Sequence, residues 1–178
     1  RTAAALVDLL LKNNWIKRVL FLADRNALVR QAKKNFGEHL PNLSSIDLTE
    51  DKEHDGVRMI FSTYPTMMNR IDNIRDSDER FYGVGHFDLI IVDEAHRSVY
   101  NRYKAIFEYF DSLVVGLTAT PKESIDHNTF ELFGCPTKDP TFNFDLEQAV
   151  PKYLNPFRNF DVSTEFIREG IKYNELSE

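Results

Sequence analysis

One stretch, residues 87–96, constrains the fold of this chain more than any other. Its sequence is Phe-Asp-Leu-Ile-Ile-Val-Asp-Glu-Ala-His. The run Leu89–Val92 is short, apolar and rich in β-branched residues, which is typical of a strand buried on both faces of a parallel sheet. Two carboxylates, Asp93 and Glu94, follow this run at once. Because ligands of open α/β sheets bind beyond the carboxyl ends of the strands, the two acids predict a ligand-binding site at that edge of the sheet.

Asp93 and Glu94 are expected to have different tasks, because successive strand side chains point to opposite faces. We expect Asp93 to hold a Mg²⁺ ion through water, and Glu94 to orient or deprotonate a water that attacks a γ-phosphate. Phosphoryl transfer needs both parts, since its catalysis is mostly positioning and charge neutralisation. The simpler alternative is a helix N-terminus, where acidic residues interact favourably with the helix dipole.

Apolar runs alternate with helical patterns along the chain. We expect strands at residues 19–23, 46–48, 57–61, 89–92 and 113–117, and helices at 2–12, 26–36, from 65 onward and 103–110. Asp24 is expected to cap the second helix and Gly37 to end it. Ser62-Thr63 is expected to cap a helix that starts at Pro65. This alternation predicts an α/β fold with a doubly wound, mostly parallel sheet.

The pattern divides the chain into two parts. Residues 1–125 are predicted to form one domain, and residues 126–178, where prolines and aromatic residues accumulate, a peripheral extension. Residues 71–80 are highly charged and predict either a surface helix or a loop. Residues 158–167 are expected to form an extended strand that leaves the domain.

Composition limits the class of protein. The chain has 178 residues and a net charge of −6, which argues against a histone-like nucleic-acid binder but allows a local basic path on one face. No apolar run reaches the roughly 18 residues of a membrane span, so no membrane partner is expected. The single cysteine, Cys135, excludes an internal disulfide and suits a reducing compartment, which predicts a cytoplasmic location.

Polar residues also follow other predicted strands. The hydroxyls of Thr118-Ala119-Thr120 can bond to a neighbouring acid or to His96, although such a sequence also fits a turn or a helix cap. Arg25, at a helix N-terminus, can hold a phosphate together with backbone N–H groups, or can be a plain surface arginine. Thr63, at a predicted helix start, can contact a nucleic-acid backbone. His96 beside a helix start also fits a structural role.

These residues carry a resemblance to a known family. Four segments, in this order, resemble motifs Ia, Ib, II and III in the first motor domain of superfamily 2 helicases and translocases: Ala23-Asp24-Arg25, Ser62-Thr63-Tyr64, Asp93-Glu94-Ala95-His96 (the DEAH box) and Thr118-Ala119-Thr120. Within that superfamily, residues 24–31, 116–121, 141–150 and 166–171 look like the motor (R) subunit of type I restriction enzymes.

The resemblance implies a RecA-like fold, hydrolysis of ATP with Mg²⁺, and translocation on double-stranded DNA in company with modification and specificity subunits. It implies that Asp93 binds the metal and that Glu94 activates water. His96 and residues 118–120 would couple the nucleotide to DNA. Arg25 and Thr63 would contact the DNA backbone.

The sequence also departs from that family. No G-x-x-x-x-G-K-[ST] phosphate-binding loop occurs in it, and Arg1-Thr2 looks like the residues that follow the Lys-Thr of such a loop. A second motor domain and a nuclease domain are not seen either. We therefore expect an incomplete motor domain, without its first strand and P-loop, that does not hydrolyse ATP by itself. The alternatives are another superfamily 2 helicase acting on DNA or RNA, and a non-catalytic DNA-binding or docking module.

Overall fold

The structure is a computed structural model that describes residues 1–52, 56–72, 82–93, 99–118, 123–124, 127–128, 130, 133–136, 138–150 and 152–156. The chain forms two compact units, Arg1–Pro140 and Thr141–Glu178. In the second unit, a single turn of helix, α6 (Leu146–Ala149), is described. The expected division into residues 1–125 and 126–178 stays a prediction.

A five-stranded sheet forms the centre of the first unit. Its strands are β1 (Val19–Ala23), β2 (Ser45–Asp47), β3 (Met59–Thr63), β4 (Leu89–Asp93) and β5 (Leu113–Leu117). They lie in the order β2-β3-β1-β4-β5, and every neighbouring pair is parallel. A short antiparallel pair, β6 (Glu123–Ser124) and β7 (His127–Asn128), follows β5.

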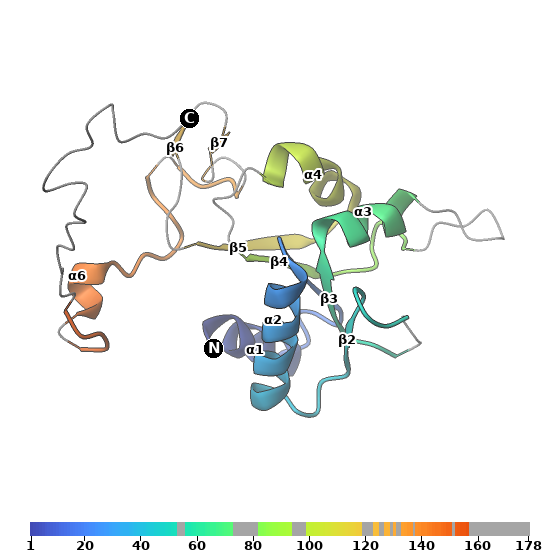
Figure 1. Ribbon diagram of the computed structural model, residues 1–178, viewed down its shortest axis with the longest axis horizontal. Coiled ribbons are helices and arrows are strands. Elements are labelled where there is room, and N and C mark those ends of the chain that lie inside the picture. Colours follow the sequence, from blue (N-terminus) through green and yellow to red (C-terminus); the bar gives the residue numbers. More distant parts are fainter. Residues whose placement is uncertain are drawn as a thin grey trace, which may run out of the picture. The chain divides into compact units, whose positions relative to one another are not determined.

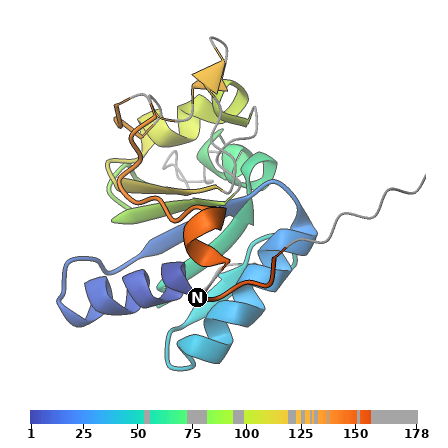
Figure 2. The same cartoon turned by 90° about the vertical axis from the view of Figure 1, so that its left-hand side faces the viewer.

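Helices cover both faces of this sheet. α1 (Thr2–Lys12) and α2 (Asn26–His39) lie on one face, and α3 (Tyr64–Asp72) and α4 (Val99–Tyr109) lie on the other, as Figure 1 and Figure 2 show. Each face has its own cluster of buried apolar side chains. The central strands contribute alternate residues to the two clusters, so they are apolar along their whole length. The predicted doubly wound, parallel α/β fold is confirmed.

Helix α2 passes through Gly37, so the prediction that this glycine ends the helix is wrong. The ring of Phe36 is buried against Phe21 and Phe61, at centroid distances of 5.9 and 5.5 Å. The amide of Leu40 donates to the Phe36 carbonyl at 2.7 Å and completes the last turn. A glycine inside a helix costs roughly 0.5–1 kcal/mol relative to alanine. Burial of the Phe36 ring, which stabilises by about 1.5–3 kcal/mol, exceeds that cost.

The predicted cap of α2 also differs from the structure. The N-cap of α2 is Arg25, in an extended conformation (φ −136°, ψ 147°) and without a side-chain capping bond, so Asp24 is not the cap. Ser62 and Thr63 are the last two residues of β3, and α3 begins directly after them at Tyr64, one residue before the expected start at Pro65. The expected cap at Ser62-Thr63 stays a prediction.

Other boundaries agree closely with the sequence-based predictions. α1, β1 and β5 have the expected bounds, β4 is one residue longer at its end, and β2 begins and ends one residue earlier than expected. The predicted strand at 57–61 lies two residues later, at 59–63. Residues 73–80 and 158–167 lie outside the described residues. In the part of the chain that is described, no helix is long and apolar enough to cross a membrane.

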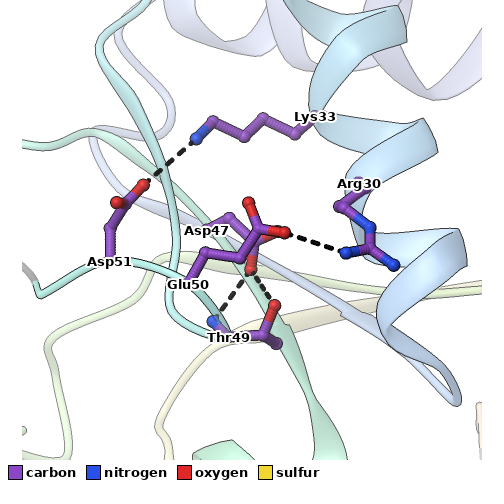
Figure 3. Close-up of polar contacts among 6 residues, drawn as sticks. All are labelled: Arg30, Lys33, Asp47, Thr49, Glu50 and Asp51. Carbon is purple, nitrogen blue, oxygen red and sulfur yellow. Dashed lines mark hydrogen bonds and ion pairs between the residues drawn. The ribbon is translucent and has the colours of Figure 1, made fainter.

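The loop after β2 is fastened to α2. A buried aspartate, Asp47, accepts hydrogen bonds at Oδ1 from the Thr49 amide (2.8 Å) and the Thr49 hydroxyl (2.7 Å), which folds the chain into a turn (Figure 3). Beyond this turn, Glu50 pairs with Arg30 of α2 at 3.0 Å and Asp51 approaches Lys33 Nζ at 3.5 Å. These ion pairs are exposed and contribute little by themselves. The turn at Asp47 therefore holds the loop in place.

We expect Asp47→Ala to lower the free energy of unfolding by about 1–3 kcal/mol, because it leaves the Thr49 amide and hydroxyl without their acceptor. Asp47→Asn retains an oxygen that can accept both bonds and should cost less. Urea unfolding of the intact protein measures both values. As a control, Glu50→Gln should change stability by no more than about 1 kcal/mol, since its ion pair is exposed. Equal losses for Asp47→Ala and Asp47→Asn would contradict this assignment.

Candidate functional site

The pairing register of the sheet brings the carboxyl ends of four strands, β1, β3, β4 and β5, to the same edge. Thr63 of β3 is paired with Ala23 of β1, and Asp93 of β4 with Leu117 of β5. β1 joins the two pairs, because Leu22 is paired with Val92, the residue before Asp93. Neighbouring strands lie about 4.8 Å apart, so the backbones of Thr63 and Asp93 are roughly 10 Å apart with β1 between them. Residues that are distant in sequence thus meet at one sheet edge.

Asp93 is the last residue of β4, a strand that is otherwise buried. The four residues before it in β4 are buried, whereas Asp93 itself is partly exposed. The strand therefore delivers one carboxylate to the surface at the point where the sheet ends. Thr118 follows β5 directly and is exposed. Four other predicted site residues lie outside the described residues: Glu94, His96, Ala119 and Thr120.

Arg25 lies at the same edge, at the start of α2. Its side chain is 70% exposed, and its Nε is 3.6 Å from Oδ2 of the preceding Asp24, too long for a close hydrogen bond. Its carbonyl accepts from the amides of Leu28 and Val29, which begins the helical hydrogen bonding. The first amides of a helix face outward without intrahelical partners, and they favour an anion. Arg25 and this helix end thus present a positive charge and N–H donors, the groups that phosphates prefer as partners.

Thr63 has a less open position than the sequence suggested. It is 5% exposed, and its Oγ1 is 2.9 Å from Oγ1 of Thr66 in the first turn of α3. Thr66 is partly exposed, so this pair of hydroxyls extends from the buried strand end toward the surface. Sequence reasoning did not single out Thr66. Its spacing of three residues from Thr63 at a helix start is the signal that would have found it.

Tyr64 is a further residue that was not assigned a role from the sequence. It is 2% exposed and follows Thr63 directly. Burial raises the pKa of its phenol, and the negative charges of Asp24 and Asp93 raise that pKa further. The phenol is therefore neutral throughout the physiological range. Its pKa responds to carboxylates at the ends of two different strands, Asp24 after β1 and Asp93 at the end of β4.

The carboxylates of this edge fit one kind of metal site and not another. Among the residues whose placement is described, no three histidine, cysteine, aspartate or glutamate side chains are gathered so that they could hold a metal ion. A protein cage for a metal is therefore not found there. Mg²⁺ in nucleotide sites instead keeps several waters and binds one or two carboxylates together with substrate phosphates. Asp93, a single partly exposed carboxylate at the strand end, fits that second kind of site.

Much of the chain matches a known protein family and individual proteins of known type. Residues 1–123 match the family model of the type III restriction enzyme, res subunit. The endonuclease subunit of the type I restriction enzyme EcoAI from Escherichia coli is 30% identical over 180 residues, covering 95% of this chain and 21% of that protein. The corresponding EcoKI subunit of Escherichia coli strain K12 is 28% identical over 176 residues, covering 84% of this chain and 14% of that protein. The chain thus spans about a fifth or less of the length of these relatives.

A solved structure has a similar fold. It is the SWI2/SNF2 ATPase core of Sulfolobus solfataricus in complex with double-stranded DNA, with a TM-score of 0.54 and 16% sequence identity. The similarity covers 70% of this chain and 26% of that one, and it shows that the sheet and its helices form a RecA-like α/β domain. The motifs, the fold and the match over residues 1–123 agree: the chain belongs to the restriction enzyme res subunit family, and its sequence relatives include endonuclease (R) subunits of type I restriction enzymes.

Proposed function

We propose that this chain is part of the first motor domain of an ATP-dependent DNA translocase, the R subunit of a type I restriction enzyme. One observation carries the proposal. The register of the sheet gathers Asp93, Thr63 and Arg25, which come from three separate motifs, at a single edge. Placement at one edge of a packed sheet would give nucleotide-binding and DNA-binding residues a rigid connection, as coupling between the two ligands requires. Membership in the res subunit family supports this interpretation.

The nucleotide would bind at the β4 and β5 end of the edge. Asp93 would hold Mg²⁺, most simply through water, and the ion would neutralise charge on the phosphates. Glu94 would orient the attacking water and accept its proton. His96 and the stretch 118–120 would respond to the state of the nucleotide and couple it to DNA. The partly exposed position of Asp93 at a buried strand end supports the metal-binding role.

DNA would bind at the β1 and β3 end of the same edge. Arg25 would contact a backbone phosphate, aided by the N-terminus of α2. Thr63 would contribute through its bonded partner Thr66, because its own hydroxyl is buried. The ATPase core of similar fold is in complex with double-stranded DNA, which supports that class of nucleic acid. The sequence relatives are endonuclease subunits of type I restriction enzymes. This similarity supports modification and specificity subunits as partners, and a cytoplasmic location.

Exchange of Arg25 tests the DNA-binding role. In the intact protein, Arg25→Ala should weaken binding to double-stranded DNA equally for different sequences and lower the slope of log K against log salt by about one, because one phosphate contact is lost. Arg18→Ala is a matched control, since Arg18 is exposed and precedes the opposite end of β1. Titrations at several salt concentrations give both slopes. An unchanged slope for Arg25→Ala, or the same change for Arg18→Ala, would contradict the assignment.

Exchange of the two acids tests the nucleotide-binding role. Asp93→Asn should weaken binding of ATP in the presence of Mg²⁺, since a neutral amide is a poorer ligand for a hard cation. Glu94→Gln should leave that affinity nearly intact and lower ATP turnover by about 10²–10⁴-fold, the usual contribution of a general base. Both are measured in the intact protein, by nucleotide titration and by phosphate release with saturating ATP and DNA.

The two results separate the proposed function from its alternatives. Equal losses of affinity for ATP with Mg²⁺ in both variants would show that Asp93 and Glu94 do not have the separate roles proposed. Full turnover in Glu94→Gln would show that this edge is not the catalytic one and would favour the docking module. Turnover stimulated by RNA and not by double-stranded DNA would instead favour a different superfamily 2 helicase.

A further inference from the structure

Gly116, inside β5, makes a close contact that a side chain at this position would prevent. The ring of Phe133 lies directly against it: a methyl group on Gly116 would come within 2.8 Å of Cε1 of the ring and closer still to Cε2 and Cζ. Carbon atoms in contact lie about 3.5–4.0 Å apart, so the ring and a methyl group cannot both occupy this space. A glycine inside a strand often marks such a close approach.

Phe133 is held in a turn by the backbone of Phe130. The carbonyl of Phe130 accepts hydrogen bonds from the amides of Phe133 (3.2 Å) and Cys135 (2.9 Å), and its own side chain is buried. Gly134 has a positive φ of 63°, which glycine adopts without a steric cost. The ring of Phe133 is partly buried and packs against the apolar cluster on the α3 and α4 face of the sheet. The ring therefore has a defined position over β5.

The ring lies next to the point where Thr118 leaves the sheet. Alternate residues of a strand share a face, so Val114, Gly116 and Thr118 follow one another on the same side of β5. Gly116 contributes no side chain to that face, and the Phe133 ring fills its place. Thr118 follows about 6.6 Å further along the strand direction. Leu117, between them, is paired with Asp93, so the ring supports the strand end that places Thr118 beside Asp93.

This contact comes from a part of the chain that the sequence predicted to be peripheral. Phe133 lies outside residues 1–123, the stretch that matches the family model. It belongs to the first compact unit, Arg1–Pro140, together with the strands of the sheet. The segment after β7 thus contributes a side chain to the strand end that carries Thr118.

We propose that Phe133 is a positioning residue: its ring, seated on Gly116, sets the position of the end of β5 and so of Thr118 relative to Asp93. A smaller side chain than the ring would leave a void into which the strand end can move, and a larger residue than Gly116 would push the strand end and the ring apart. A misplacement of about 1 Å in a catalytic site can cost about 10²-fold in rate. The inference rests on the proposed function, in which residues 118–120 respond to the nucleotide.

Three variants of the intact protein test this match in size: Phe133→Leu, Gly116→Ala and the two combined. Leucine lacks Cε1, Cε2 and Cζ, the three ring atoms that a methyl group on Gly116 would meet, so the two exchanges are compatible with each other. Each single variant should lower ATP turnover, with saturating ATP, Mg²⁺ and double-stranded DNA, by roughly 10- to 100-fold. The double variant should turn over ATP faster than Gly116→Ala alone, because its exchanges compensate for each other.

Val114→Ala separates positioning from general stability. Val114 lies on the same face of β5 and packs against the same cluster, but it is two residues further from Thr118 than Gly116 is. Its exchange should lower the urea midpoint of unfolding and leave turnover of the folded protein unchanged. Amides 116–118 should exchange hydrogen faster in Phe133→Leu than in Val114→Ala, without any nucleotide present. These comparisons of Phe133→Leu carry the test even if Gly116→Ala does not fold.

The remaining outcomes overturn the inference. Additive losses of turnover in the double variant would show that the ring and the glycine act separately. Unchanged turnover in both single variants, or an equal loss in Val114→Ala, would show that the contact stabilises the fold without positioning Thr118, while the proposed function would stand. An intact wild-type protein that does not hydrolyse ATP under these conditions would overturn the proposed function, and this inference with it.

Discussion

The in-register pairing of β3, β1, β4 and β5 is the constraint on which the rest of this structure depends. It requires strands that are apolar on both faces, since α1 and α2 cover one face and α3 and α4 the other. Once the strands are paired, their ends are level, and the residues that follow them must share one edge. A shift of one residue in β3 would exchange the faces of all its side chains and move Thr63 away from Ala23. The same register thus fixes the packing of the strands and the set of residues that share this edge.

Much of the fold could be predicted because its strands carry an unambiguous signal. β1 and β5 are uninterrupted apolar runs between polar residues, and both were found with their observed ends. Local signals failed where a distant contact overrode them. Gly37 favours a helix end, but packing of Phe36 on two strands extends α2 past it. The strand expected at residues 57–61 lies at 59–63, because pairing with β1 extends β3 through Thr63.

The candidate site shows the same division between local and distant signals. The sequence pointed to Asp93, Thr118, Arg25 and Thr63 because each follows a predicted strand, and the structure places these four at the ends of β4, β5, β1 and β3. It could not reveal that Thr63 is buried and bonded to Thr66, or that Tyr64 stacks on Tyr103. The stack joins helices that are distant in sequence, and no periodicity within either helix encodes it.

Hydrogen exchange of the intact protein tests the central claim most directly, namely that the carboxyl edge of the sheet handles both ligands. With a non-hydrolysable ATP analogue, Mg²⁺ and double-stranded DNA present, we expect slower exchange in the segments that follow β1, β3, β4 and β5, at residues 24–28, 64–67, 94–98 and 118–120. The segments before β1, β4 and β5, at residues 14–18, 84–88 and 111–112, should exchange as before. Protection of the amino-terminal segments, or none at the carboxyl edge, would contradict the account.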